Sequence, residues 1–96
     1  MTTDTQESAA GNPSPIRVLL ADDHTLMREG VRRILSADGG IEVVAEAGDG
    51  QAAVSETLAL QPDVAVLDIT MPGGGGLDAA RQIRKQAPEV RILILS

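Results

Sequence analysis

Residues 62–77 read PDVAVLDITMPGGGGL, and this stretch decides the fold. Its apolar run at 64–67 predicts a short strand that is buried on both faces and ends at Asp68. A glycine-rich loop follows at 71–76, and residues 77–86 carry apolar side chains at helical spacing. A buried strand, a loop and an amphipathic helix in this order indicate one half of a β-α-β unit.

The same alternation repeats on both sides of this stretch. We expect further strands at 16–20, 41–45 and 91–95, and further helices at 24–37 and 50–60. Apolar strands that alternate with amphipathic helices predict an α/β fold, with a doubly wound parallel sheet covered by helices on both faces. Right-handed crossovers restrict the topology further.

Helical periodicity also predicts which side chains face the sheet. Arg28 and the other charged residues of the first helix are expected to point mostly outward, and Asp49 is expected to cap the second helix. The predicted inward positions are Met27, Gly30, Val31 and Ile34 in the first helix, Ala53, Val54, Thr57 and Leu58 in the second, and Leu77, Ala80 and Ile83 in the third.

Length and composition limit the class of protein. With 96 residues the chain forms one small domain, which we place at 16–96 after a polar, disordered tail at 1–15. The chain has no cysteine, which excludes a disulfide framework and a cysteine-based zinc site. A net charge of −6 argues against non-specific nucleic-acid binding. No secretory signal or membrane-spanning run is present, and we expect a cytoplasmic protein with no membrane partner.

Acidic residues follow two strands that the topology can make neighbours. Asp22 and Asp23 come after the first strand, and Asp68 ends the third. Ligands of open α/β sheets bind beyond the carboxyl ends of the strands. Three carboxylates that converge there would repel one another unless a cation neutralised them, and oxygen ligands in an open crevice suit Mg²⁺. An Asp carboxylate can also act as a nucleophile and form an aspartyl phosphate, and the hydroxyl of Ser96 could bond a phosphoryl oxygen.

Each of these residues also has a simpler interpretation. A single Asp after a strand is usually a turn former or a helix cap, and the convergence of three is what favours a site. His24 is better explained as a residue of the first helical turn than as a ligand. The glycine-rich loop lacks the Lys and Ser or Thr of a nucleotide-binding P-loop.

Four segments together resemble the receiver domains of NarL/FixJ-type response regulators. They are ADDHTLMREGVRRIL at 21–35, AEAGDGQAA at 45–53, PDVAVLDITMPGGGGLDAARQIR at 62–84 and RILILS at 91–96. The resemblance covers the chain from about residue 16 onward. It implies a flavodoxin-like strand order of 2-1-3-4, a sensor histidine kinase as phosphodonor, and a protein that is not a turnover enzyme.

The resemblance also implies a role for particular residues. Asp68 would be the phosphoacceptor, and Asp23 a direct Mg²⁺ ligand that Asp22 assists through water. Thr70 would offer its backbone carbonyl to the metal, and Ser96 would be the switch hydroxyl that turns toward the phosphoryl group. The glycine that opens the third helix would be Gly76.

Part of the family pattern has no counterpart in this sequence. Members continue through a fourth helix, a fifth strand that ends in a phosphoryl-binding lysine, and a fifth helix. The one lysine here, Lys85, matches the outer end of the third helix instead. The helix-turn-helix output domain, through which relatives contact DNA and regulate transcription, has no counterpart either.

These departures leave two alternatives to the phosphate-accepting receiver. One is a truncated receiver fragment that switches poorly and acts only as an interaction or dimerisation module. In that case strand 91–95 would be an exposed edge through which the chain self-associates, and Ile94→Lys should abolish the association. The other is a flavodoxin-like or hydrolase-like enzyme, which the two aspartates after the first strand and Thr70 after Asp68 disfavour.

Overall fold

The computed structural model describes residues 14–72 and 75–95, and the elements alternate as expected. The strands are β1 (Ile16–Ala21), β2 (Ile41–Ala47), β3 (Val64–Asp68) and β4 (Arg91–Leu95). The helices are α1 (Thr25–Ser36), α2 (Gly50–Leu60) and α3 (Gly75–Gln86). Most of the expected tail, residues 1–13, lies outside the described residues, as does Ser96.

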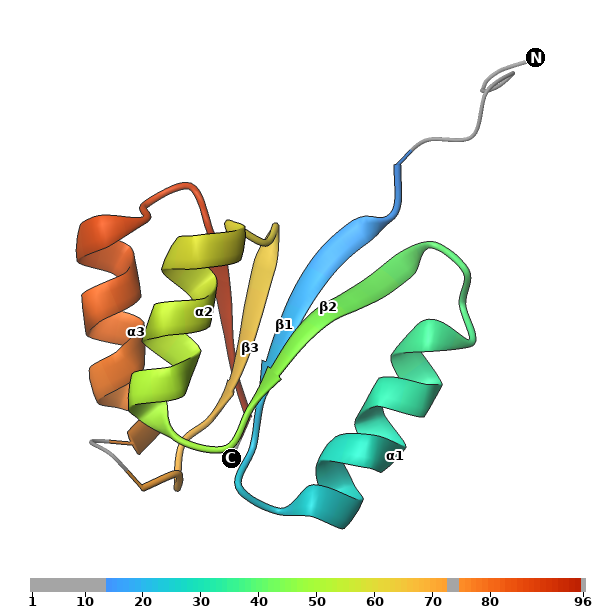
Figure 1. Ribbon diagram of the computed structural model, residues 1–96, viewed down its shortest axis with the longest axis horizontal. Helices are drawn as coiled ribbons and strands as arrows, with labels where there is room; N and C mark the ends of the chain where they lie inside the picture. The colour runs from blue at the N-terminus through green and yellow to red at the C-terminus, as the bar shows by residue number, and fades with distance from the viewer. Residues whose placement is uncertain (1–13, 73–74, 96) are drawn as a thin grey trace.

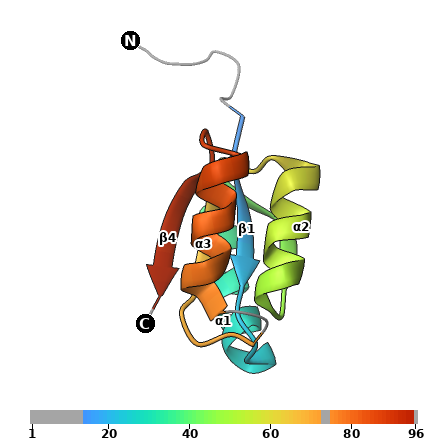
Figure 2. The same ribbon diagram turned by 90° about the vertical axis from the view of Figure 1, so that its left-hand side faces the viewer.

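The sheet is parallel throughout, and its strand order is β2-β1-β3-β4. Helices α2 and α3 pack side by side on one face, and α1 lies on the other (Figures 1 and 2). The predicted α/β class, the doubly wound arrangement and the strand order are therefore confirmed. The order places β1 next to β3, so the residues that follow these two strands meet at one edge.

The two faces of the sheet have unequal cores. The larger core lies between the sheet and helices α2 and α3, and it is built from small and branched aliphatic side chains. On the α1 face the buried cluster is only Val18, Leu20 and Val66, with partly buried neighbours around it. No aromatic residue contributes, because the chain has none. Shape-matched packing of Ala, Val, Leu and Ile must therefore supply the hydrophobic stabilisation.

The inward face of α1 differs from the predicted one. Val31 and Leu35 pack toward the sheet, whereas Met27 is 59% exposed and Ile34 is 75% exposed. The helix contacts β1 and β2, so one flank of its apolar stripe has no described element to pack against. The prediction was wrong for Met27 and Ile34 because it assumed that the whole apolar stripe would be covered.

The other two helices follow the prediction more closely. The Asp49 carboxylate accepts a hydrogen bond of 2.7 Å from the Ala52 N–H and caps α2, as expected. Ala53, Val54 and Thr57 are buried under this helix. In α3 the residues Ala80 and Ile83 are buried, but the prediction was wrong for Leu77, which is 48% exposed. None of the helices in the described part of the chain is long and apolar enough to cross a membrane.

Strand β4 forms one edge of the sheet within the described residues, because it pairs with β3 alone. Leu93 points away from the larger core and is 54% exposed. Ile92 and Ile94 point to the other face and pack against that core. The edge strand therefore presents both unpaired backbone groups and an exposed leucine.

Candidate functional site

Hydrogen bonds between strand ends position the acidic residues at the carboxyl edge of the sheet. Asp22 follows β1 directly, and its N–H donates to the Ala47 carbonyl at the end of β2, at 2.9 Å. Asp68 is the last residue of β3, and the N–H of the next residue, Ile69, donates to the Leu95 carbonyl of β4 at 3.0 Å. Sheet hydrogen bonds therefore fix the backbone on both sides of the crevice.

The structure brings Asp22, Asp23 and Asp68 together. One carboxylate oxygen from each, together with a nitrogen of His24, lies within 4.8 Å of all the others. The exposed fraction of the side chain is 1% for Asp22, 13% for Asp68 and 31% for Asp23. The three carboxylates thus range from buried to partly open, and the crevice remains accessible from solvent.

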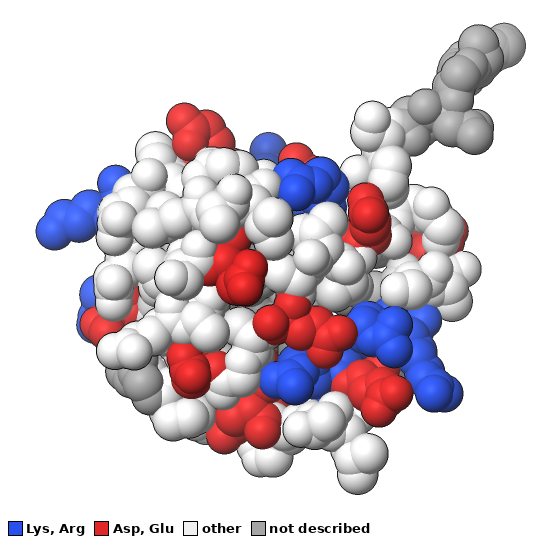
Figure 3. Space-filling model, in the orientation of Figure 1, with Lys and Arg blue, Asp and Glu red and all other residues white. Residues whose placement is uncertain are grey.

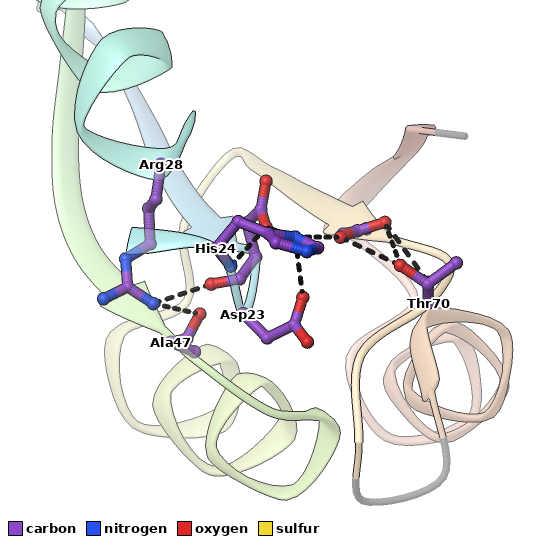
Figure 4. Close-up of polar contacts among 7 residues, drawn as sticks. Asp23, His24, Arg28, Ala47 and Thr70 are labelled. Atoms are coloured by element: carbon purple, nitrogen blue, oxygen red, sulfur yellow. Dashed lines mark hydrogen bonds and ion pairs between the residues drawn. The ribbon is translucent and has the colours of Figure 1, made fainter. Parts of the chain in front are cut away.

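His24 lies at the centre of this cluster, a position that the sequence did not indicate. Its Nδ1 atom is 3.0 Å from Asp23 Oδ1, 3.2 Å from Asp22 Oδ1 and 3.9 Å from Asp68 Oδ2 (Figure 4). His24 is also the N-cap residue of α1, but its side chain makes no capping hydrogen bond. Among the described residues, His24 is the one ion-pair partner of these carboxylates.

Arg28 contradicts the prediction that it faces outward. Its guanidinium donates to the Asp22 carbonyl at 2.6 Å and to the Ala47 carbonyl at 3.3 Å, and it pairs with Glu46 at 3.1 Å. Figure 4 shows the side chain reaching from α1 to these carbonyls. Figure 3 shows other basic side chains of α1 beside carboxylates at the surface. Arg28 turns inward because the carbonyls of Asp22 and Ala47 accept its N–H groups, and it thereby holds the backbone before Asp23.

Thr70 contacts Asp68 through its N–H and its hydroxyl. The N–H donates to Asp68 Oδ1 at 3.2 Å, and the hydroxyl lies 3.2 and 3.3 Å from the two carboxylate oxygens. These contacts orient the Asp68 side chain, whereas the expected role of the Thr70 carbonyl stays a prediction. Lys85 lies in the last turn of α3, at the end of the sheet where the strands begin, which is the placement that the sequence indicated.

Gly76 allows α3 to approach the phosphoacceptor candidate closely. A Cβ atom at this position would lie 2.2 Å from the Asp68 carbonyl oxygen and 2.8 Å from the Asp68 carbonyl carbon. Helix α3 begins at Gly75, two residues before the predicted start at 77 and one residue before the glycine that the resemblance implies, and Gly75 has a φ of 77°. At the end of the loop that follows β3, Gly76 therefore avoids a clash with Asp68, and Gly75 adopts a positive φ that other residues rarely adopt.

The acidic residues line a hollow at the surface. Its walls also include two apolar side chains, from α1 and from the end of β4. The complete lining is Asp22, His24, Met27, Asp68, Thr70 and Leu95. A group the size of a phosphate could enter this hollow and reach the carboxylate of Asp68.

The donor set fits a hard divalent cation. Three carboxylates converge here, and one of them is almost fully buried. Such a charge is costly to bury unless a cation or several hydrogen-bond donors compensate it. Oxygen ligands with access to water are the coordination that Mg²⁺ prefers.

The parallel sheet of this strand order and the acidic crevice at the ends of β1 and β3 agree with the result of a comparison with known protein families. The chain matches the family model of the response regulator receiver domain over residues 18–96, and it belongs to that family. It is thus a receiver domain of a two-component response regulator, of the NarL/FixJ type. Receiver domains are not turnover enzymes.

The relatives are longer than this chain. It is 46% identical over 83 residues to the nitrate/nitrite response regulator protein NarP of Escherichia coli, covering 86% of this chain and 39% of NarP. It is 42% identical over 85 residues to the transcriptional regulatory protein DegU of Brevibacillus brevis, covering 88% of this chain and 36% of DegU. The chain therefore spans less than two fifths of the length of these relatives.

A solved structure shows the same fold. The CheX-CheY-BeF3-Mg²⁺ complex from Borrelia burgdorferi contains a chain with a TM-score of 0.80 and 26% identity to this one. The match covers 84% of this chain and 61% of that chain. The receiver fold described above is therefore incomplete relative to this structure.

Proposed function

We propose that this chain accepts a phosphoryl group on Asp68 in a reaction that depends on a divalent cation, Mg²⁺ in the first instance. The observation that carries the proposal is the convergence of Asp22, Asp23 and Asp68, whose ligand oxygens lie within 4.8 Å of one another. Ser96 stays a proposed switch hydroxyl, because it lies outside the described residues.

The exposure of Asp68 supports its proposed role as a nucleophile. Its side chain is 13% exposed, so a phosphodonor can reach it from the hollow. A carboxylate oxygen of Asp68 would form a bond to phosphorus while the bond from phosphorus to the donor's leaving group breaks. The leaving group, imidazole from a kinase histidine or acetate from acetyl phosphate, departs with the electron pair. The product is an aspartyl phosphate.

Asp23 and Asp68 would bind the cation directly, Asp22 would assist through water, and the Thr70 carbonyl would add a backbone ligand. When bound, the cation would offset the negative charge that builds up on the phosphoryl oxygens. The hydrogen bonds from Thr70 to Asp68 restrict rotation of the carboxylate. Arg28, by fixing the Asp22 carbonyl, would keep the metal-binding loop in register with β2.

The donor and the readout lie outside this chain. A sensor histidine kinase is the proposed phosphodonor, on the basis of the receiver family. Because the chain spans only part of its transcription-regulating relatives, control of transcription and DNA contact are proposed for an output domain in a longer protein.

The proposal predicts phosphorylation that requires a divalent cation. Incubation of the protein with acetyl phosphate and Mg²⁺ should add one phosphate, detected by mass spectrometry of the intact chain. EDTA should abolish the addition, because without the cation the three carboxylates repel the donor. Labelling is expected to be slow, since no lysine in this sequence matches the family's phosphoryl-binding position. Equal labelling in EDTA would contradict the role given to the cation.

The β4 edge favours a second candidate function, an interaction module that pairs with another copy of the chain. Exposed strand edges present unpaired N–H and C=O groups and invite pairing. Leu93 adds an apolar side chain that is 54% exposed on this edge. A polypeptide of residues 1–96 should therefore sediment as a dimer or larger species at high concentration.

Leu93 is a better position than Ile94 for a substitution that tests this association. Ile94 packs against the larger core, so Ile94→Lys would disturb folding as well as the edge. Leu93→Lys is cleaner because the side chain is already half exposed. Leu93→Lys should give a monomer in sedimentation, whereas Leu26→Lys, at an 85% exposed leucine of α1, should leave the association unchanged. Wild-type protein that stays monomeric at high concentration would rule this candidate out.

A further inference from the structure

We propose that His24 is a nitrogen ligand of the crevice, and that it makes the site prefer first-row transition ions such as Co²⁺ over Mg²⁺. The inference rests on the proposed cation site and concerns its selectivity. The carboxylates alone would form a set of oxygen ligands, which suits Mg²⁺. An imidazole nitrogen added to that set changes which ion is bound most tightly.

The geometry places the His24 nitrogen where a ligand would be. At metal–ligand distances of about 2.1 Å, neighbouring ligand atoms of an octahedral ion are about 3 Å apart and opposite ones about 4 Å apart. The Nδ1 atom lies 3.0 Å from Asp23 Oδ1, 3.2 Å from Asp22 Oδ1 and 3.9 Å from Asp68 Oδ2. The separation from Asp23 Oδ1 matches that of neighbouring ligands, and the separation from Asp68 Oδ2 approaches that of opposite ligands.

The side chain of His24 is available for this role because it is open to solvent and does not cap the helix. It is 66% exposed and makes no capping hydrogen bond to α1. The polar contacts of its ring are with the carboxylates of the cluster. The backbone of His24 is fixed separately, since its N–H donates to Asp22 Oδ1 at 2.8 Å and its carbonyl accepts from the Arg28 N–H at 2.9 Å.

Ligand chemistry gives the direction of the preference. Carboxylates and water suit Mg²⁺, whereas imidazole suits the later first-row metals, for which affinity rises from Mn²⁺ through Co²⁺ toward Cu²⁺. Mg²⁺ gains little from a nitrogen donor and would bind through the carboxylates alone. Removal of the imidazole should therefore weaken Co²⁺ binding selectively.

The test compares Co²⁺ and Mg²⁺ binding to wild type and to His24→Gln by titration calorimetry. The loss of an outer-shell partner already costs roughly 10–100-fold in metal affinity, so the loss of this ligand should weaken Co²⁺ binding at least about tenfold. Mg²⁺ affinity should stay within about threefold by the same ligand preference. His24→Asn, which places a favoured N-cap residue before α1, gives a second variant with the helix start preserved.

A spectroscopic readout identifies the ligand directly. The chain contains a single histidine, so any imidazole signal comes from His24. Paramagnetic proton NMR of the Co²⁺-loaded protein should show one strongly shifted, exchangeable ring N–H resonance, which disappears in His24→Gln. Such a resonance with a Co²⁺-selective loss of affinity supports the inference.

The outcomes separate this inference from the function on which it rests. Binding of both ions with no shifted ring resonance, and with equal affinities in the two proteins, overturns the role of His24 and leaves the cation site standing. Failure of wild type to bind either ion overturns both. Tighter binding of both ions by His24→Gln also overturns the inference, because it would mean that the ring blocks the site.

Discussion

Asp68→Asn should abolish phosphorylation of this chain. The amide is nearly the same size as the carboxylate and can keep the contacts with Thr70, but it is not a nucleophile toward phosphorus. We expect no added phosphate after incubation with acetyl phosphate and Mg²⁺, measured by mass spectrometry of the intact protein. The effect is complete loss of labelling rather than a reduced rate.

The control variants distinguish the acceptor from its neighbours. Asp78→Asn makes the same chemical change in the first turn of α3, where the side chain contacts Gln82, and should leave labelling unchanged. Asp23→Asn should slow labelling, because a proposed cation ligand is removed while the acceptor remains. Persistence of one phosphate on the Asp68→Asn protein would show that another residue is the acceptor.

The order of elements was predictable from the sequence because strands in a sheet covered by helices appear as short, nearly continuous apolar runs. The run at 64–67 is continuously apolar and lies between Asp63 and Asp68, and the run at 91–95 is apolar after its first residue and begins three residues after Pro88. Such short runs can only be covered if helices lie on both faces of the sheet. Element ends moved by no more than two residues, for example from 45 to Ala47 at the end of β2.

The inward face of α1 was less predictable, because a periodic apolar stripe does not say how much of it is covered. Met27 and Ile34 lie on the same stripe as Val31, yet only Val31 reaches the sheet. Periodicity gives the direction of a helix face but not the width of the surface that packs against it.

His24 and Arg28 were missed for a different reason. The role of Arg28 depends partly on Ala47 at the end of β2, and that of His24 partly on Asp68 at the end of β3, and both of these residues are distant in sequence. A histidine at a helix start and one arginine among several in α1 carry no local signal. Arg28 could have been suspected only from its place one helical turn after His24, on the side that faces the strand ends.

Gly76→Ala should cause a large loss of stability. The new Cβ would lie 2.2 Å from the Asp68 carbonyl oxygen and 3.0 Å from Ile69 Cα. Both contacts are with backbone that sheet hydrogen bonds fix, so the strand end or the helix must move. Overpacking of this kind costs about 1–3 kcal/mol, and we expect the upper end of that range.

Gly30→Ala provides a matched control, for which we expect a gain rather than a loss of stability. A Cβ atom at Gly30 meets nothing within 4 Å, and the residue lies inside α1. Alanine should therefore stabilise the domain by about 0.5–1 kcal/mol through its higher helix propensity. Urea denaturation followed by circular dichroism measures the free energy of unfolding of both variants. Gly76→Ala is also made in the Gly30→Ala background, whose added stability keeps the protein folded enough to measure.

The position of Gly76 links this loss of stability to the site. If α3 is displaced from the end of β3, Asp68 moves relative to Asp23, and the cation ligands lose their spacing. Gly76→Ala in the Gly30→Ala background should therefore bind Mg²⁺ more weakly than Gly30→Ala alone, by at least about tenfold if the Asp68 ligand is lost. Unchanged stability together with unchanged Mg²⁺ affinity would show that the loop after β3 can accept a side chain here. In that case the close approach of α3 would have no part in holding Asp68 against the other two carboxylates.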